Sequence, residues 1–128
     1  MTSLKKEIIA SCLETSSIEE TGAVSALFRF PGTFTAFSGH FPGYPILPAF
    51  VQILTAIILL EETKGRSLEL ESVEKAKFLA EIRPDQIIKI ECRPLKASDK
   101  NKWKVQLMVV DSIAASFLVT VYETEIAP

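Results

Sequence analysis

Apolar and polar residues alternate with a period of two through most of the second half of the chain. Ile88, Ile90 and Cys92 alternate with charged neighbours, and Trp103 and Val105 begin the same pattern again. Such alternation is typical of a β-strand that buries one face. It predicts four strands, separated by loops rich in turn-forming residues. Their expected ranges are 68–81, 86–97, 102–110 and 113–125.

The longest apolar run predicts a buried helix ahead of these strands. Residues 49–60 are apolar except for Gln52 and Thr55, so a helix over about 48–62 would be hydrophobic nearly all round and buried on most sides. A proline suits its first turn, and Gly65 suits its C-terminal end. The apolar run rises about 18 Å as a helix, too short for a hydrocarbon core of about 30 Å. We therefore expect no membrane span.

The N-terminal part predicts one short helix and one strand. The helix covers residues 2–10, the pattern over 10–25 is mixed, and residues 25–30 alternate like a strand until Pro31-Gly32 breaks it. One buried helix followed by four strands indicates an α+β fold in which the sheet wraps around the helix. A five- or six-stranded antiparallel sheet curled around a long central helix is the hotdog architecture.

Composition narrows the class of protein further. The chain of 128 residues is long enough for one hydrophobic core, so we expect a single domain over 1–128. Fourteen basic and sixteen acidic residues give a net charge of −2, and no Lys/Arg cluster along the sequence indicates nucleic-acid binding. Cys12 and Cys92 match no metal-ligand spacing and suggest two reduced thiols in a cytoplasmic protein. The first thirteen residues carry no apolar stretch typical of a signal peptide.

The segment from Phe37 to Pro48 combines His40 with regularly spaced Gly and Pro residues, directly before the predicted helix. It resembles the signature F-x-G-H-F-P-x-x-P-x-x-P-G-V of the 3-hydroxyacyl-acyl-carrier-protein dehydratases, which a long helix follows. Here Ala49-Phe50 stands in place of the final Gly-Val. Further on, Lys77-Phe78 and residues 83–86 resemble the next strand and the P-G-D turn of that family, with the glycine absent.

This resemblance implies roles for several residues. It implies that His40 moves a proton at the carbon next to a thioester carbonyl, a task that suits imidazole because its ordinary pKa lies near neutral pH. It also implies that the carbonyl oxygen lies against the Ala49 N–H, at the positive start of the helix. It implies neither a metal nor a cofactor. The predicted substrate pocket consists of Phe41, Pro42, Tyr44, Phe50, Leu54, Thr55 and Ile58.

The second catalytic group of the family is missing from its expected place. The resemblance implies a Glu or Asp fourteen residues after the histidine and a Gln four residues later, but these positions hold Leu54 and Ile58. Losing a positioned acid typically costs about 10²–10⁴ in rate. Gln52 lies about 200° around the helix from Leu54, so we expect it to face away and make a structural hydrogen bond. Glu61 and Glu62 are expected at a solvated helix end.

Two hypotheses follow for the function. The first is a dehydratase that converts 3-hydroxyacyl to trans-2-enoyl thioesters on acyl carrier protein, in fatty-acid or related lipid or polyketide biosynthesis. The second is a catalytically degenerate protein that binds acyl chains or acyl carrier protein, or that pairs with an active subunit supplying the carboxylate. Thioester hydrolysis is a weaker third option, since it also needs a carboxylate. The resemblance implies a homodimer or a higher oligomer of dimers, which would cover an open sheet edge.

Overall fold

Two helices, one 3-10 turn and six strands make up the described part of the chain, which covers residues 3–15, 19–38, 43–95 and 101–124 of the computed structural model. In chain order they are α1 (Ser3–Ala10), β1 (Cys12–Thr15), β2 (Val24–Arg29), η1 (Thr35–Phe37), α2 (Ala49–Lys64), β3 (Leu68–Phe78), β4 (Ile87–Pro94), β5 (Asn101–Val109) and β6 (Ser112–Glu123). The predicted long helix and all five predicted strands are therefore confirmed, with ends that move by a few residues.

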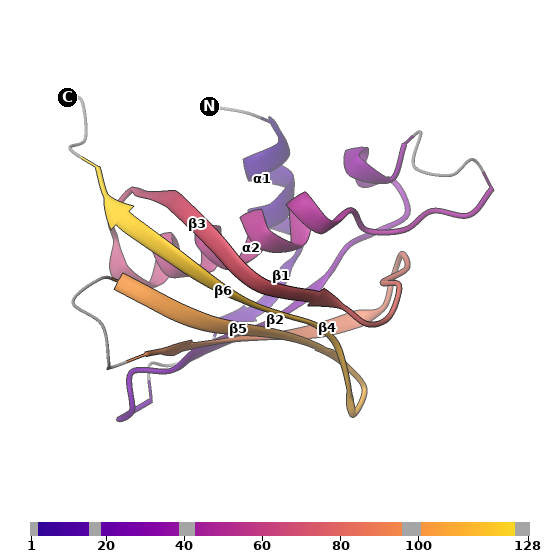
Figure 1. Ribbon diagram of the computed structural model, residues 1–128. Helices are drawn as coiled ribbons and strands as arrows, with labels where there is room; N and C mark the ends of the chain where they lie inside the picture. Colours follow the sequence, from indigo (N-terminus) through magenta and orange to yellow (C-terminus); the bar gives the residue numbers. More distant parts are fainter. Residues whose placement is uncertain (1–2, 16–18, 39–42, 96–100, 125–128) are drawn as a thin grey trace.

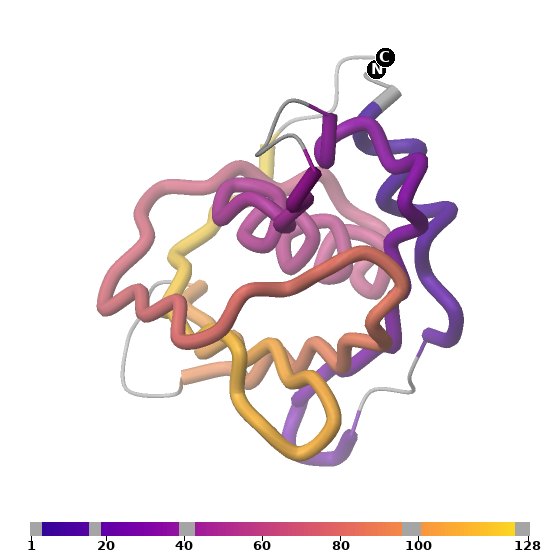
Figure 2. Tube along the Cα trace, turned by 90° about the vertical axis from the view of Figure 1, so that its right-hand side faces the viewer, coloured from indigo at the N-terminus to yellow at the C-terminus, as the bar shows by residue number. Residues whose placement is uncertain are grey.

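The six strands form one antiparallel sheet in the order β1-β2-β4-β5-β6-β3. The sheet curls around α2, while α1 lies beside that helix (Figures 1 and 2). Strand β1 lies in the stretch 10–25, where the sequence predicts no regular element. Its four residues show no alternation of buried and exposed side chains, so the hydrophobic pattern could not indicate it. The observed arrangement is the predicted α+β hotdog architecture.

The predicted inward faces of the strands form the core. Ile88, Ile90 and Cys92 are fully buried on β4, whereas the alternate residues Lys89 and Arg93 are exposed. The corresponding apolar residues of β2, β5 and β6 are also buried, which confirms the alternation read from the sequence. These side chains pack with the inner residues of α2 in one hydrophobic cluster. The curved sheet thus covers the helix with apolar side chains.

Helix α2 begins and ends where its flanking residues predict. Pro48 is the N-cap, and Gly65 is the C-cap with a positive φ of 66° and an N–H that donates to Glu61 O at 2.8 Å. The prediction of burial on most sides holds for the middle of the helix, where residues 55–60 are all buried. It is wrong for one side of the first turns, where Phe50 is 56% exposed and Leu54 is only partly buried. The first turns of α2 therefore present apolar surface that the described part of this chain does not cover.

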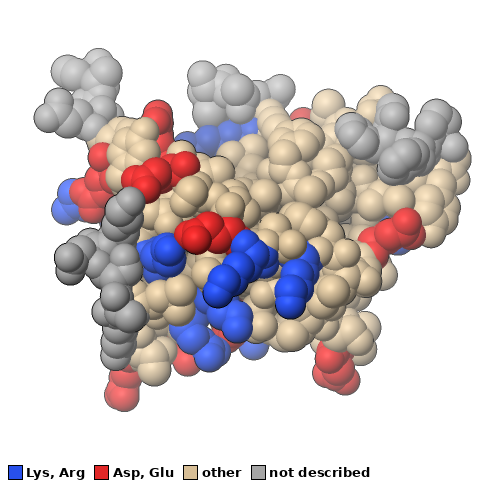
Figure 3. Space-filling view, viewed as in Figure 1, with Lys and Arg blue, Asp and Glu red and all other residues tan. Residues whose placement is uncertain are grey.

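The sheet brings together basic residues that lie apart in the sequence. Lys and Arg side chains gather over β3, β6 and β5 in the view of Figure 3. On β4 and β5 the alternation turns Lys89, Arg93 and Lys104 outward, and Arg93 lies directly opposite Lys104. Their spacing along the chain gave no sign of this gathering. None of the described helices is long and apolar enough to cross a membrane.

Candidate active site

The loop that leads to α2 is anchored to the core on its N-terminal side by three phenylalanines. The ring centroids of Phe30 and Phe34 lie 4.7 Å apart, and those of Phe34 and Phe37 lie 5.7 Å apart in an edge-on contact. All three side chains are buried. The Thr35 N–H donates to Glu7 Oε1 at 3.0 Å, and this hydrogen bond lowers the pKa of the Glu7 carboxyl. The start of the motif is thus fixed by packing and by α1.

The C-terminal side of the same loop is anchored by Leu47. Its side chain is buried, and its N–H donates to Ile82 O at 2.8 Å, in the connection after β3. The next residue, Pro48, takes an extended ψ of 151° and then α2 starts. The predicted base His40, with Phe41 and Pro42, lies outside the described residues.

The start of α2 leaves backbone donors free of the bonds of the helix itself. The N–H groups of Val51 and Gln52 donate to Pro48 O at 3.1 and 3.2 Å. The N–H groups of Ala49 and Phe50 precede this first helical bond, as expected for the first turn of any helix. Such donors, together with the positive end of the helix dipole, suit a developing negative charge on oxygen. The predicted oxyanion donor Ala49 therefore has the backbone setting that this role requires.

A cavity of about 330 Å³ opens at this helix start. It is lined by Ile46, Leu47, Pro48, Ala49, Gln52, Phe78, Leu79, Ala80 and Glu81. Two of these residues bring polar side chains to a mostly apolar wall, Gln52 from the helix and Glu81 from the connection after β3. The cavity therefore combines the Ala49 backbone, one amide and one carboxylate.

Gln52 makes the structural hydrogen bond expected from the sequence, but only with one end of its amide. Its Nε2 donates to Leu47 O at 3.1 Å, and the residue is 4% exposed. Its Oε1 is buried and has no hydrogen-bond partner among the described residues. Turning the amide over would place Oε1 against the Leu47 carbonyl oxygen, so the donor end is fixed. A buried acceptor left unpaired costs about 1–3 kcal/mol, which makes this oxygen unusual.

Glu81 belongs to a small polar cluster at the same cavity. The Tyr44 hydroxyl donates to Glu81 Oε1 at 2.6 Å, and the Arg83 guanidinium carbon lies 3.8 Å from the centroid of the Tyr44 ring. Glu81 could not be predicted from the motif, because the resemblance implies a carboxylate fourteen residues after the histidine, on the helix. A search of the connection after β3, where residues 83–86 resemble the family turn, would have found it.

The described residues of the predicted substrate pocket do not share one cavity. Phe50 and Leu54 line a mostly apolar groove of about 460 Å³ between α2 and β3, together with Leu68, Leu70 and one carboxylate, Glu69. Tyr44 is exposed and contacts the Glu81 cluster. Thr55 is fully buried, and its hydroxyl donates to the carbonyl oxygen of the preceding helical turn at 2.6 Å. The residues predicted to form one substrate pocket therefore lie in separate places: in the groove beside β3, at the Glu81 cluster and in the core beneath α2.

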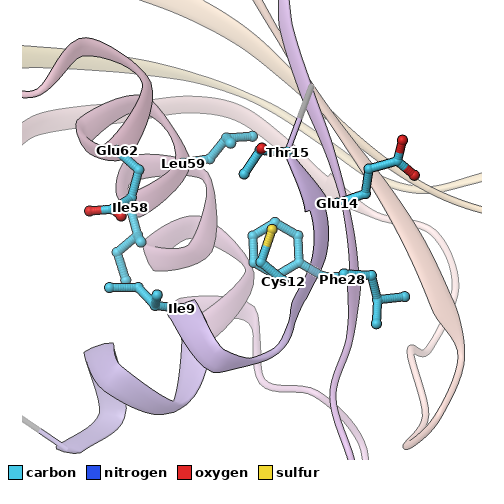
Figure 4. A pocket seen from close by; sticks show the side chains of 9 residues that line it. Ile9, Cys12, Glu14, Thr15, Phe28, Ile58, Leu59 and Glu62 are labelled. Atoms are coloured by element: carbon cyan, nitrogen blue, oxygen red, sulfur yellow. The ribbon is translucent and has the colours of Figure 1, made fainter. Parts of the chain in front are cut away.

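Ile58 faces another cavity, of about 290 Å³, between the second half of α2 and strands β1 and β2 (Figure 4). Cys12 and Phe28 form the strand side of this cavity, and Glu62 lies at its helix side. Burial raises the pKa of the Cys12 thiol, and it raises the pKa of Cys92 in the core to about 12. Both thiols are free. No cluster of His, Cys, Asp or Glu suited to a metal occurs among the residues described.

The fold and the site define a hotdog-fold protein whose motif loop runs into the start of its central helix. The family model of the ApeI-like dehydratases, described as ApeI dehydratase, matches residues 15–116. The chain belongs to this ApeI-like dehydratase family. The resemblance stated from the motif is thereby confirmed.

Curated relatives and solved structures agree with this family. The chain is 34% identical over 100 residues to the 3-hydroxyacyl-[acyl-carrier-protein] dehydratase FabZ of Caulobacter vibrioides, covering 69% of this chain and 63% of that protein. It is 32% identical over 88 residues to FabZ of Lactobacillus helveticus, covering 62% and 60%. The chain thus spans less than two thirds of the length of these relatives.

Two solved structures share the fold at low sequence identity. The dehydratase heterocomplex ApeI:P from Xenorhabdus doucetiae matches with a TM-score of 0.71 and 17% identity, covering 86% of this chain and 95% of that one. A Streptococcus mutans protein bound to acetyl CoA matches with a TM-score of 0.65 and 10% identity, covering 87% of each chain. Both likenesses support the hotdog architecture described above.

Proposed function

We propose that the protein removes water from 3-hydroxyacyl thioesters carried by acyl carrier protein and forms the trans-2-enoyl thioester. The observation that carries this proposal is the Phe37–Pro48 motif, which leads straight into the start of α2 in a chain of the ApeI-like family. The curated relatives named above are dehydratases of this substrate class. Fatty-acid or related lipid or polyketide biosynthesis, in the cytoplasm, would use such a reaction.

Removal of the C2 proton and stabilisation of the carbonyl oxygen each have a candidate group in the motif. His40 takes the proton from the carbon next to the thioester carbonyl, as general base. The Ala49 N–H donates to the carbonyl oxygen while negative charge develops on it, and the start of α2 adds its dipole. The acyl chain then lies against apolar side chains such as Phe50 and Leu54, which line the groove beside β3.

We further propose a homodimer, or an oligomer of such dimers. Strand β3 is an end of the sheet and pairs with β6 alone among the described strands. The apolar groove beside it is formed by Phe50, Leu54, Leu68 and Leu70, and Phe50 is more than half exposed. A second copy packed here would bury this apolar surface and pair an edge strand that is otherwise open.

A degenerate role is the second candidate, and Leu54 is the observation that favours it. Leu54 occupies the position of the family carboxylate, and an apolar side chain there cannot donate a proton. In that case the protein would bind acyl chains or acyl carrier protein, or would serve as one half of a heterodimer whose partner brings the carboxylate.

One assay separates the two candidates. Purified protein is given a 3-hydroxyacyl thioester on acyl carrier protein, and the enoyl thioester is followed by its absorbance. We expect wild-type turnover and a loss of about 10²–10⁴ in His40→Ala, because a general base is removed. Glu123→Gln changes an exposed carboxylate paired with Arg66 and serves as the control with unchanged turnover. An inactive wild type that gains activity in Leu54→Glu would establish the degenerate role instead.

A further inference from the structure

We infer that Glu81 is the general acid of this protein, and that the carboxylate missing from position 54 of α2 is supplied by the connection after β3. This inference rests on the proposed dehydration. It names the group that protonates the leaving hydroxyl, for which the family motif offers no residue at its usual place. Four features of the structure support it, concerning the cavity, the backbone, the side-chain contacts and the opposite side of the helix.

The first feature is that Glu81 shares a cavity with the proposed oxyanion donor. Ala49 and Glu81 both line the space of about 330 Å³ at the start of α2. The carbonyl carbon and the carbon that bears the hydroxyl are separated by one carbon in a 3-hydroxyacyl thioester. A carbonyl held at Ala49 therefore keeps the leaving hydroxyl within the same small space. Glu81 is the one carboxylate among the described residues that line it.

The second feature is the backbone around Glu81, which is held on both sides. Before it, the N–H groups of Leu79 and Ala80 both donate to Ala114 O, at 2.8 and 3.1 Å. After it, Ile82 is fully buried, and its carbonyl oxygen accepts the Leu47 N–H at 2.8 Å. The second bond ties the connection directly to the residue before Pro48. The position of Glu81 relative to the helix start is therefore set by short-range backbone contacts.

The third feature is the set of contacts made by the Glu81 side chain. The Tyr44 hydroxyl binds one carboxyl oxygen, Oε1, at 2.6 Å and leaves the other available to a ligand. Arg83 lies over the Tyr44 ring at 3.8 Å, which restricts where that ring can go. A catalytic acid needs this kind of orientation, because proton transfer requires hydrogen-bond distance to the leaving oxygen.

The fourth feature is the difference between the two sides of α2. The groove on the Leu54 side is lined by apolar residues and by Glu69 of β3, and Ala49 is not among its lining residues. The cavity of Glu81 on the Gln52 side is lined by Ala49 itself. The proposed oxyanion donor and the Glu81 carboxyl group therefore adjoin the same space, as the reaction requires.

The proton balance of the reaction closes with these groups. The C2–H bond breaks, and its proton goes to His40 while its electron pair becomes the second bond between C2 and C3. The C3–O bond breaks with its electrons, and that oxygen takes a proton from the Glu81 carboxyl group and leaves as water. The proton on His40 then passes through solvent to the Glu81 carboxylate, and the protein returns to its initial state.

The test compares two leaving groups, because only one of them needs an acid. A 3-hydroxyacyl thioester must have its oxygen protonated, whereas a 3-chloroacyl thioester loses chloride without a proton. Wild type, Glu81→Gln, His40→Ala and the control Glu123→Gln are assayed on both, after subtraction of the rate without protein. Glu81→Gln keeps the size of the side chain and alters an exposed residue, so we expect it to fold normally. Circular dichroism and the melting temperature check this.

We expect Glu81→Gln to lose about 10²–10⁴ in turnover of the 3-hydroxyacyl thioester and less than about fivefold with the 3-chloroacyl thioester. His40→Ala should lose turnover of both, since both need the C2 proton removed. Equal losses of Glu81→Gln on the two substrates would give Glu81 a structural role and overturn the inference, as would unchanged turnover of both. A wild type inactive on both substrates would instead refute the proposed dehydration, and the inference with it.

Discussion

The Leu54 side and the Gln52 side of the first turns of α2 are lined by different kinds of residue, although the two positions are only two residues apart. On one side Leu54 lines an apolar groove together with Leu68 and Leu70 of β3. On the other side Gln52 lines a cavity that Glu81 also enters from the connection after β3. In the family resemblance the acid belongs to the first side. In this chain Glu69 of β3 lines the groove on the first side, whereas Gln52 and Glu81 adjoin the cavity that Ala49 lines on the second.

The proposed role of Glu81 means that a catalytic group is defined by its place around the substrate, and not by its place in a motif. An acid must reach the leaving oxygen, and a helix residue or a neighbouring loop residue can do so equally if both adjoin the helix start. An apolar side chain at position 54 has its own use, since it enlarges the apolar surface available to an acyl chain or a second subunit. Moving the acid would allow one side of the helix to become entirely apolar.

The largest expected effect comes from moving the carboxylate back. In a Glu81→Gln background, Leu54→Glu should restore at least about tenfold of the lost turnover of a 3-hydroxyacyl thioester, because a carboxyl group regains its family position. In the wild-type background Leu54→Glu should raise turnover little, since Glu81 already acts as the general acid. Steady-state turnover of the four combinations measures this. Leu54→Gln is the control, because glutamine has the size of glutamate but no carboxyl group. If Leu54→Gln restored turnover to the same extent, a polar side chain and not an acid would be what position 54 needs.

The fold could be predicted from the sequence wherever hydrophobic periodicity was strong. Strands β4, β5 and β6 bury alternate residues, and the helix begins after a proline and ends at Gly65, so both patterns are local. Strand β1 could not be predicted, because its exposed four-residue edge carries no period. The end of β3 was placed three residues late at 81, since Leu79 and Ala80 donate to Ala114 O outside the strand pairing.

The site was less predictable, because its parts come from separate segments. The helix start and Ala49 followed from the motif, and Gln52 was expected to face away from Leu54. Its hydrogen bond to Leu47 O confirms the structural role expected for it. The pairing of Tyr44 with Glu81 spans 37 residues and depends on how the loop and the connection after β3 meet. No local pattern contains that information.

A middle-sized effect is expected at Gln52. Replacing it by Leu removes the unpaired Oε1 but also the donor to Leu47 O, so these two changes offset and the free energy of unfolding should move by less than about 2 kcal/mol. Because the lost donor holds Leu47 O, next to Pro48 and the start of α2, turnover should fall up to about tenfold, as for one lost hydrogen bond. Urea unfolding and steady-state kinetics measure the two quantities separately.

Thr63→Val is the matched control for Gln52→Leu, since Thr63 is also a polar residue on α2 that donates to a main-chain oxygen, Leu59 O, at 2.8 Å. It lies at the far end of the helix and should leave turnover unchanged. If Gln52→Leu also retained full turnover, the hydrogen bond to Leu47 O would contribute only to stability and not to the position of the helix start during catalysis.

The smallest expected effect concerns the hydroxyl that holds Glu81. Tyr44→Phe removes the bond of 2.6 Å to Oε1, but Tyr44 is 45% exposed, so water replaces much of its contribution. About 1 kcal/mol of lost orientation corresponds to about fivefold in turnover. Tyr122→Phe provides a matched control, because Tyr122 is 46% exposed and its hydroxyl donates at 2.9 Å to Glu69 Oε2, and Glu69 lines the Leu54 groove and not the helix-start cavity. A loss confined to Tyr44→Phe and to the 3-hydroxyacyl substrate would show that orientation of the acid matters. An equal loss in both variants would trace the effect to general destabilisation.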